Sequence, residues 1–543
     1  MTDFSHSLVD LLEQSALRTP QRIAVDFLGK CISYATLWQE VQKLATALQK
    51  NGVGKGTKIA LMLPNCPAYM RYYFATLLAG GTVVNLNPLY TAHEIEDHVI
   101  QVGADYLVTL HMTKLVEKVL PLCNGQSSLK HIITVNLGND LPRVQRIGFK
   151  VTKFREFYRK ESKAIWMHND IMADAHHATF TRPVIDPEND IAVLQFTGGT
   201  TGKSKAAMLT HGNLMANVQQ CRDWFYGAEE GKEIFLAVIP FFHVFALTSI
   251  LHLGIALSAT LIALPRFELK QLLKTVDRKQ PTIFQAVPTL YTAIVNAKNL
   301  SRYNLRSIKL CISGGAPLPL DIRKKFQTIT GCKLVEGYGL TECSPVACCN
   351  PLDGRPIKDK SIGLPLDGTH VSIRSLDDPR IVMPHNESGE ICIKGPQVMK
   401  GYYNQPVETD AVLVDGWLRT GDIGTIDNDG YVFIVDRLKD LIICGGYNVY
   451  PNHIEDAVYK HPAVEECICA GVPDPYRGEA VKIWVKCKEG ESVSKDDLKN
   501  FLTKYLSPVE LPRHIEFRTD PLPKTLIGKL SRKDVLAQEK SHA

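Results

Sequence analysis

The stretch that decides the fold is AVLQF at residues 192–196, which runs directly into TGGTTGKSK at residues 197–205. The apolar run predicts a buried β-strand. The loop residues that can approach or bind an anion are Thr197, Gly198, Gly199, Thr200, Thr201, Gly202, Lys203 and Lys205. Glycines let backbone amides come close to a negative charge, threonine hydroxyls add donors, and lysines add positive charge. A strand that ends in such a loop predicts a phosphate-binding turn.

A Walker A loop, with the pattern GxxxxGK[ST], is the main alternative for this turn. Gly202-Lys203-Ser204 matches the end of that pattern, but Thr197 stands where its first glycine would be. The chain then runs through AAMLT into a turn at His211-Gly212, whereas a Walker loop enters its helix at once. The Walker interpretation is therefore the weaker one.

Short apolar runs alternate with helix-length segments on both sides of this loop. The runs are KIALML (58–63), YLVTL (106–110), HIITVNL (131–137), EIFLAVI (233–239), TIFQAV (282–287) and SIKLCIS (307–313). This alternation predicts parallel α/β layers. After about residue 365, the runs HVSIRS, GEICIKG and GYVFIVD are separated by turn-rich pieces, which predict a small antiparallel or barrel-like subdomain.

The chain of 543 residues is too long for one hydrophobic core, so we expect two domains. Residues 1–436 should form a large N-terminal domain of two layered α/β subdomains plus the barrel-like subdomain. Residues 437–543 should form a small α+β domain. The fold class is therefore α/β with a smaller C-terminal domain.

Composition narrows the class of protein. Apolar residues make up 45% of the chain and charged residues 22%, as in globular proteins. A net charge of +5 is too weak to indicate a nucleic-acid partner. The N-terminus lacks the apolar core of a secretory signal, so we expect a cytoplasmic protein whose 14 cysteines are reduced. The apolar stretch at 247–264 predicts a buried helix running into a strand.

The segment TGGTTGKSKAAMLTHGN (197–213) resembles the phosphate-binding signature of the adenylate-forming superfamily. That superfamily includes acyl-CoA synthetases, peptide-synthetase adenylation domains and luciferases. Its members usually have glycine after the second lysine, where this chain has Ala206, and we expect the added methyl group to be tolerated.

Further motifs follow in the order that the family has. They are PFFHVF (240–245), SGGAP (313–317), EGYGLTE (336–342), WLRTGD (417–422), DRLKD (436–440) and PKTLIGKLSR (523–532). Beyond the loop, the resemblance implies ATP contacts from Gly315, Ala316, Pro317, Glu336, Gly337, Tyr338, Gly339, Thr341, Asp422, Arg437 and Lys529. In this assignment Tyr338 stacks on adenine and Asp422 accepts hydrogen bonds from the ribose hydroxyls, with Arg437 as its partner.

The resemblance also implies the catalytic groups. Lys529 is the mobile catalytic lysine, and Thr341 donates to a phosphate. Glu342 is an oxygen ligand for Mg²⁺, with Thr197 near the metal. His243 helps to shape the carboxylate pocket. The hinge between the domains aligns with Lys439, and Gly445 and Gly446 line the tunnel for the pantetheine arm of coenzyme A.

These roles imply an acid–thiol ligase that uses ATP, Mg²⁺ and coenzyme A. Three longer stretches, at 336–351, 394–406 and 415–440, resemble fatty acyl-CoA synthetases in particular, so we expect a long-chain fatty acid as substrate. A medium-chain or aryl acid–CoA ligase stays open, as does a stand-alone adenylation enzyme that loads a carrier protein. A non-catalytic binding protein is disfavoured because Lys529, Glu342 and Asp422 are all present. A homodimer is left open.

Residues 143–163 carry eight basic and two acidic side chains. Ile147, Val151, Phe154 and Tyr158 recur there at helical spacing. The favoured interpretation is an amphipathic helix packed on its own domain, with a solvated basic face. The alternative is peripheral contact with the cytoplasmic face of the membrane, where such a helix can lie on an anionic bilayer.

Overall fold

The computed structural model describes residues 7–125, 127–174, 178–197, 204–444, 447–524 and 530–542. The chain forms two compact units. Unit 1 comprises Met1–Asp359, Gly363–His370 and Lys394–Leu418, and unit 2 comprises Lys360–Ile362, Val371–Ile393 and Arg419–Ala543. The predicted α/β class, with a smaller C-terminal part, is confirmed. The domain boundary expected after residue 436 stays a prediction.

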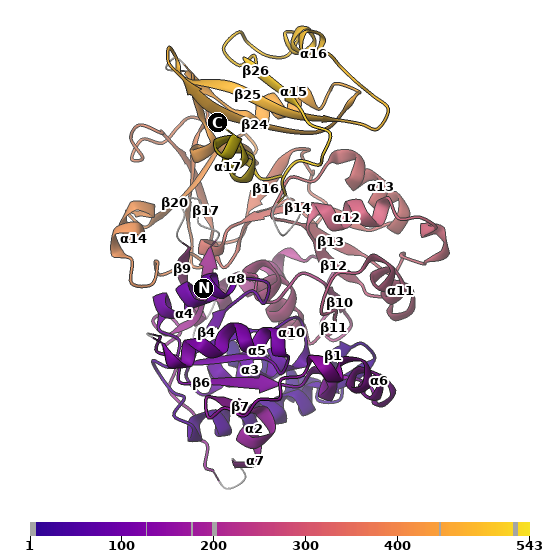
Figure 1. Ribbon diagram of the computed structural model, residues 1–543, viewed down its shortest axis with the longest axis vertical. Coiled ribbons are helices and arrows are strands. Elements are labelled where there is room, and N and C mark those ends of the chain that lie inside the picture. Colours follow the sequence, from indigo (N-terminus) through magenta and orange to yellow (C-terminus); the bar gives the residue numbers. More distant parts are fainter. Residues whose placement is uncertain are drawn as a thin grey trace. The chain divides into compact units, whose positions relative to one another are not determined.

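Unit 1 contains a seven-stranded sheet in the order β7-β6-β5-β3-β4-β8-β9 (Figure 1). Its strands are β3 (Lys58–Met62), β4 (Thr82–Asn85), β5 (Tyr106–Leu110), β6 (His131–Val135), β7 (Ile165–Met167), β8 (Ile191–Thr197) and β9 (Lys205–Thr210). The six strands from β7 to β8 are parallel, and β9 runs antiparallel to β8 at the edge. The predicted phosphate loop therefore joins a buried parallel strand to an antiparallel edge strand.

A second run of paired strands has the order β2-β1-β11-β10-β12-β13-β14-β15-β16 and belongs to unit 1, except for the first two residues of β16. Its strands are β1 (Ile23–Phe27), β2 (Lys30–Ser33), β10 (Ile234–Ala237), β11 (Thr260–Ala263), β12 (Ile283–Ala286), β13 (Leu310–Ser313), β14 (Lys333–Gly339), β15 (Val346–Cys349) and β16 (Ser361–Pro365). Its central pairs, from β1–β11 to β13–β14, are parallel. Both predicted parallel layers are therefore present.

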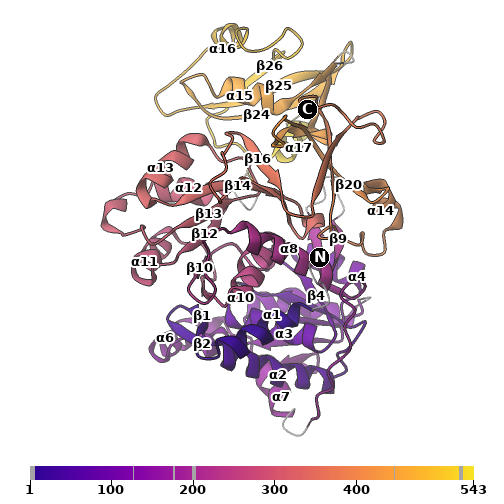
Figure 2. The same ribbon diagram turned by 180° about the vertical axis from the view of Figure 1, so that it is seen from behind.

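Helices cover these sheets with their apolar faces. The principal ones in unit 1 are α1 (Leu8–Arg18), α2 (Tyr34–Lys50), α3 (Pro67–Leu78), α4 (Ala92–Val102), α5 (Thr113–Val119), α8 (His211–Trp224), α11 (Leu269–Lys279), α12 (Pro288–Val295), α13 (Leu320–Thr330) and α14 (Pro406–Val412). Helices α4 and α5 share a core with the first sheet, and α11, α12 and α13 share one with the second. Helix α3 lies between the first sheet and α2, so nearly all of its side chains are buried (Figure 2).

The apolar stretch at 247–264 is a buried helix that leads into a strand, as predicted. It is built from α9 (Val244–Ala246), a π-helical turn (Leu247–His252) and α10 (Leu253–Ala256), and β11 follows. His252 is fully buried, and its Nε2 lies 2.9 Å from the Tyr73 hydroxyl. Within the described part of the chain, no helix is long and apolar enough to cross a membrane.

Helix α6 (Arg143–Lys153) corrects the favoured interpretation of the basic stretch. It covers only Arg143–Lys153 of the predicted stretch, and none of its residues is buried, whereas Tyr158, which was expected on the same apolar face, lies beyond the helix and is buried. Val144, Ile147 and Val151 are all exposed, and so is Phe154, which follows the helix. The apolar face is therefore not packed on its own domain, because the helix is attached through its opposite side.

Unit 2 contains the short run β17-β18-β20-β21 and a five-stranded sheet, β23-β22-β25-β24, with β26 beside β25. The strands are β17 (His370–Arg374), β18 (Gly389–Lys394), β20 (Trp417–Ile426), β21 (Val432–Arg437), β22 (Ile442–Cys444), β23 (Tyr447–Val449), β24 (Val464–Asp474), β25 (Gly478–Cys487) and β26 (His514–Phe517). Helices α15 (Pro451–Val458) and α16 (Lys495–Leu502) share a core with the larger sheet. Helix α17 (Arg532–His542) packs near Trp484 in a second cluster.

Candidate functional site

The two ends of the predicted phosphate loop are held together by strand pairing. Thr197 is the register partner of Lys205, and the Ser204 hydroxyl donates to the Thr197 carbonyl over 3.1 Å. Ala206 is fully buried in the core of the first sheet, and its carbonyl accepts a hydrogen bond from the Tyr403 amide. The methyl group that departs from the family pattern is therefore accommodated by apolar packing.

A carboxylate, a phenol and an amine are linked next to this loop. Glu342 lies in a short 3-10 turn (Thr341–Cys343) after β14, and its Oε1 accepts a 2.7 Å hydrogen bond from the Tyr402 hydroxyl. The Nζ of Lys205 lies 5.0 Å above the Tyr402 ring. Burial and the nearby Glu342 carboxylate raise the pKa of Tyr402, so its phenol stays protonated and donates. Sequence reasoning missed Tyr402, because its partner is 60 residues away.

The segments around SGGAP and YGLTE lie side by side because β13 and β14 are parallel neighbours. Ser313 is the register partner of Glu336, and the Glu336 carboxylate accepts the Leu318 amide over 2.7 Å. Burial raises the pKa of Glu336. Gly339 is a steric necessity, because a Cβ there would lie 2.0 Å from the Pro345 carbonyl oxygen. Tyr338 is almost entirely buried.

The aromatic motif at 240–245 packs against the SGGAP turn. A Cβ on Gly314 would lie 3.1 Å from the Phe245 ring, so the missing side chain admits this ring. Gly315 follows with φ +81°, a conformation that favours glycine, while Ala316 is half-buried and Pro317 exposed. Burial lowers the pKa of His243 to about 4, so its imidazole is neutral at pH 7.

Buried amides hold the aromatic motif against the first sheet. Gln195, two residues before Thr197, donates to the Phe242 carbonyl and accepts from Asn85 on β4, both over 2.9 Å. Asn65 accepts the Phe241 amide over 2.7 Å and donates to the Ile239 carbonyl. The end of β8 and the His243 loop are thereby fixed relative to each other. Sequence reasoning did not identify these amides as part of the site.

Unit 2 brings together the two residues assigned to the ribose. Asp422 on β20 is the register partner of Arg437 on β21, and Arg437 Nε lies 3.4 Å from Asp422 Oδ1. Arg437 is half-exposed, whereas the Asp422 side chain is largely covered. Lys439 is exposed in the short turn Leu438–Asp440 that follows.

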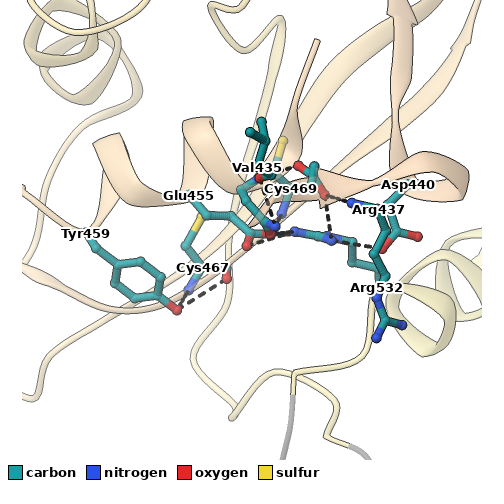
Figure 3. Close-up of polar contacts among 10 residues, drawn as sticks. Val435, Arg437, Asp440, Glu455, Tyr459, Cys467, Cys469 and Arg532 are labelled. Carbon is teal, nitrogen blue, oxygen red and sulfur yellow. Dashed lines mark hydrogen bonds and ion pairs between the residues drawn. The ribbon is translucent and has the colours of Figure 1, made fainter. Parts of the chain in front are cut away.

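The guanidinium of Arg532 lies close to three carboxylates beside this turn (Figure 3). Arg532, the first residue of α17, lies 2.9 Å from both Asp440 and Glu455 and 3.8 Å from Asp436. It also donates to the Asn452 side chain over 2.5 Å. Three ionised carboxylates around one cation would leave uncompensated buried charge, so a proton is favoured on one of them. Burial raises the pKa of Glu455 to about 7 and also raises that of Asp436.

Several predicted residues lie outside the part of the chain that the structure describes. They are Gly198, Gly199, Thr200, Thr201, Gly202, Lys203, Gly445, Gly446 and Lys529. Their assigned roles stay predictions. Of the remaining predicted residues, the structure groups Thr197, Lys205 and Glu342 in unit 1, and Asp422 and Arg437 in unit 2.

Comparison with known proteins identifies the family. The family model described as "AMP-binding enzyme" matches residues 12–403, and that described as "AMP-binding enzyme C-terminal domain" matches residues 453–529. The chain belongs to the AMP-binding enzyme family. The match covers both the loop at β8 and the segment that carries Lys529.

Curated relatives of this AMP-binding enzyme align with nearly its whole length. A long-chain-fatty-acid–CoA ligase of Bacillus subtilis is 43% identical over 98% of this chain and 94% of its own. One from Escherichia coli is 37% identical over the same shares of the two chains. A feruloyl-CoA synthase of Amycolatopsis is 32% identical over 96% of each chain.

Solved structures share the fold of this AMP-binding enzyme. ATP-bound MatB from Rhodopseudomonas palustris has a TM-score of 0.83 at 27% identity, covering 98% of both chains. The o-succinylbenzoate CoA synthetase MenE of Bacillus subtilis, in complex with its acyl-adenylate, has a TM-score of 0.78 at 26% identity, covering 97% of both chains.

The Arg532 cluster predicts a pH-dependent stability of unit 2. The pKa of Glu455 is about 7 in the fold and near 4.5 when exposed, so its stabilising contribution is complete below about pH 4.5 and is lost as the pH rises to 7. Over this range wild type should lose roughly 3 kcal/mol of unfolding free energy that the Glu455→Gln variant does not lose. Urea-dependent pulse proteolysis of unit 2 at several pH values measures the difference; parallel curves would mean that folding does not shift the pKa of Glu455.

Proposed function

We propose that this AMP-binding enzyme activates a long-chain fatty acid with ATP and transfers it to coenzyme A. The observation that carries the proposal is the full-length relation to long-chain-fatty-acid–CoA ligases, at 43% identity over 98% of the chain. The 32% identity to a feruloyl-CoA synthase keeps an aryl acid as the second candidate.

In the first half-reaction a carboxylate oxygen of the acid attacks the α-phosphorus of ATP, and pyrophosphate leaves. Negative charge develops on the transferring phosphoryl group, so catalysis consists mainly of positioning and electrostatic stabilisation. The loop from Thr197 to Lys205 is assigned to the β- and γ-phosphates, and Lys529 to the developing charge. The neutral imidazole of His243 can donate a hydrogen bond to the acid without adding a positive charge that would make the carboxylate less nucleophilic.

The residues present fit a magnesium ion held largely by substrate oxygens. Among the described residues, no group of three or more histidine, cysteine, aspartate or glutamate side chains could form a metal cage. Mg²⁺ commonly takes one or two carboxylates together with phosphate oxygens and water. Glu342, oriented by Tyr402, would supply the protein oxygen, and the bound ion would neutralise phosphate charge.

In the second half-reaction the thiol of coenzyme A attacks the acyl carbonyl carbon, and AMP leaves. Gly445 and Gly446 are assigned to the passage for the pantetheine arm, because a side chain there would narrow it. Lys529 is expected to move away with the C-terminal domain about Lys439. Peripheral contact with the membrane is part of the proposal, because a long-chain fatty acid partitions into lipid. A homodimer stays a prediction.

Lys529→Ala should slow adenylate formation about 10²–10³-fold, because one charge-stabilising contact is lost at phosphorus. Thioester formation from synthetic acyl-AMP should change much less. The two half-reactions are measured separately, by pyrophosphate release and by AMP release on addition of coenzyme A. Lys524→Ala, in the same segment, is the control. Equal loss in both half-reactions would show that Lys529 is structural.

Glu342→Gln should raise the Mg²⁺ concentration needed for half-maximal adenylation, because a neutral amide is a poorer ligand for a hard cation. Tyr402→Phe should raise it less, since the carboxylate remains but loses the phenol that orients it. Tyr403→Phe, at the neighbouring position, is the matched control. The measurement is a Mg²⁺ titration of pyrophosphate release. A Glu342→Gln curve that overlays wild type would remove the metal assignment.

Chain length decides between the fatty-acid and aryl candidates. Each methylene buried in an apolar tunnel contributes roughly 0.8 kcal/mol, so the apparent KM should fall several-fold per added carbon until the tunnel is full. Pyrophosphate release is measured with acids from about C4 to C18, with ferulate beside them, and with and without coenzyme A. We expect C12 to C18 to be preferred and AMP release to require coenzyme A. A flat series, or preference for ferulate, would contradict the fatty-acid assignment.

A further inference from the structure

Helix α6 presents an apolar stripe to solvent. The stripe consists of Val144, Ile147, Val151 and Phe154, whose spacing of three or four residues places them on one face. These side chains are 82%, 66%, 73% and 61% exposed, respectively. Both views of the molecule place α6 at the rim of unit 1 (Figures 1 and 2). The exposed stripe is therefore contiguous and largely open to solvent in the described part of the chain.

The orientation of α6 is fixed from its opposite side. The Phe149 ring lies edge-on to Phe157 with the ring centres 5.9 Å apart. The Gln145 side chain donates to the Leu28 carbonyl over 3.2 Å, and Arg146 donates to Asn139 over 3.1 Å. These contacts hold the helix so that the stripe points outward, and burying it on unit 1 would require breaking them.

Positive charge flanks the stripe. The side chains of Arg143, Lys150 and Arg155 are exposed and form no hydrogen bond or ion pair within the described residues. Arg159 lies over the Phe154 ring at 4.1 Å, so a guanidinium covers one end of the stripe. Residues 143–163 together carry eight basic against two acidic side chains. A surface of this kind combines apolar contact area with an excess of unpaired cations.

Helix α11 shows that this exposure is not a general property of basic amphipathic helices in this chain. It has 11 residues, as α6 has, and it also carries several lysines and an arginine. It buries Leu272, Leu273 and Val276 against the second sheet. The cations of α11 therefore lie on a solvated polar face opposite a buried apolar face. The cations of α6, in contrast, lie beside an apolar face that is exposed to solvent.

We propose that α6 binds the surface of an anionic lipid bilayer, with the stripe at the level of the acyl chains and Arg143, Lys150 and Arg155 at the phosphate groups. The chemistry favours lipid over a protein groove, because a helix with apolar residues on one face and unpaired cations beside them matches the boundary between acyl chains and anionic headgroups. This inference rests on the membrane contact in the proposed function and names the surface that makes it. The binding requires neither ATP nor acid, so its failure would leave the proposed reaction untouched.

The test is flotation of the full chain, without nucleotide or acid, on vesicles of phosphatidylcholine with and without phosphatidylglycerol. Wild type should bind the anionic vesicles and lose this binding as salt is raised. The double variant Arg143→Glu/Lys150→Glu should bind at least roughly 25-fold more weakly, from about fivefold for each cation removed at an anionic surface. Ile147→Ser/Val151→Ser should bind roughly tenfold more weakly through loss of apolar contact.

The matched control is Lys270→Glu/Lys274→Glu, which makes the same charge change on the exposed face of α11. It should bind nearly as wild type does. Pyrophosphate release with a water-soluble acid should be unchanged in all variants, which tests that they are folded. The proposal would be overturned if wild type bound both vesicle types equally or if the α6 variants bound as tightly as wild type. It would also be overturned if the α11 control lost as much vesicle binding as the α6 charge variant. Conversion of a wild-type dimer to monomer by the α6 variants, seen by sedimentation, would instead assign the stripe to a second copy.

Discussion

The buried amide of Gln195 is the interaction on which the arrangement of unit 1 depends. It lies on β8, two residues before the phosphate loop begins, and joins Asn85 on the first sheet to the Phe242 carbonyl in the turn between β10 and α9. A buried amide that loses its partners costs about 1–3 kcal/mol. The loop end and the His243 segment therefore hold one relative position, although they belong to different sheets. Apolar packing alone would leave that position less well defined.

The parallel layers could be predicted because their signal is local. The run at 106–110 coincides with β5, the run at 58–63 is one residue longer than β3, and the run at 282–287 is one residue longer than β12 at each end. A strand buried on both faces reads as a continuous apolar run, and the helix between two such strands sets their parallel direction. The family resemblance assigned Asp422 and Arg437 to one sugar, and the structure places them as register partners on β20 and β21.

The supporting contacts could not be predicted, because they join positions far apart in sequence. Nothing around Tyr402 indicates that its hydroxyl binds Glu342, and nothing around Arg532 indicates that it faces three carboxylates. Helix α6 shows a different limit of prediction from sequence. Its periodicity established that one face is apolar, but periodicity carries no information about what covers that face. The contacts of Phe149 and Gln145, on the other side of the helix, decide that it points away from unit 1.

The Arg532 cluster constrains how a hinge at Lys439 would work. Asp436 lies before Lys439, and its carboxylate accepts a hydrogen bond from the Asn452 backbone amide over 2.7 Å. Asp440 lies after Lys439 and pairs with Arg532. Rotation at Lys439 would keep Asp440, Glu455 and Arg532 together but draw Asp436 away from them. Asp436 is fully buried, and burial raises the pKa of its carboxyl group. If rotation exposed this group, the carboxylate would regain its hydration but lose its contacts with Asn452 and Arg532. Because these two effects oppose each other, the cluster can hold one orientation without making the other prohibitively costly.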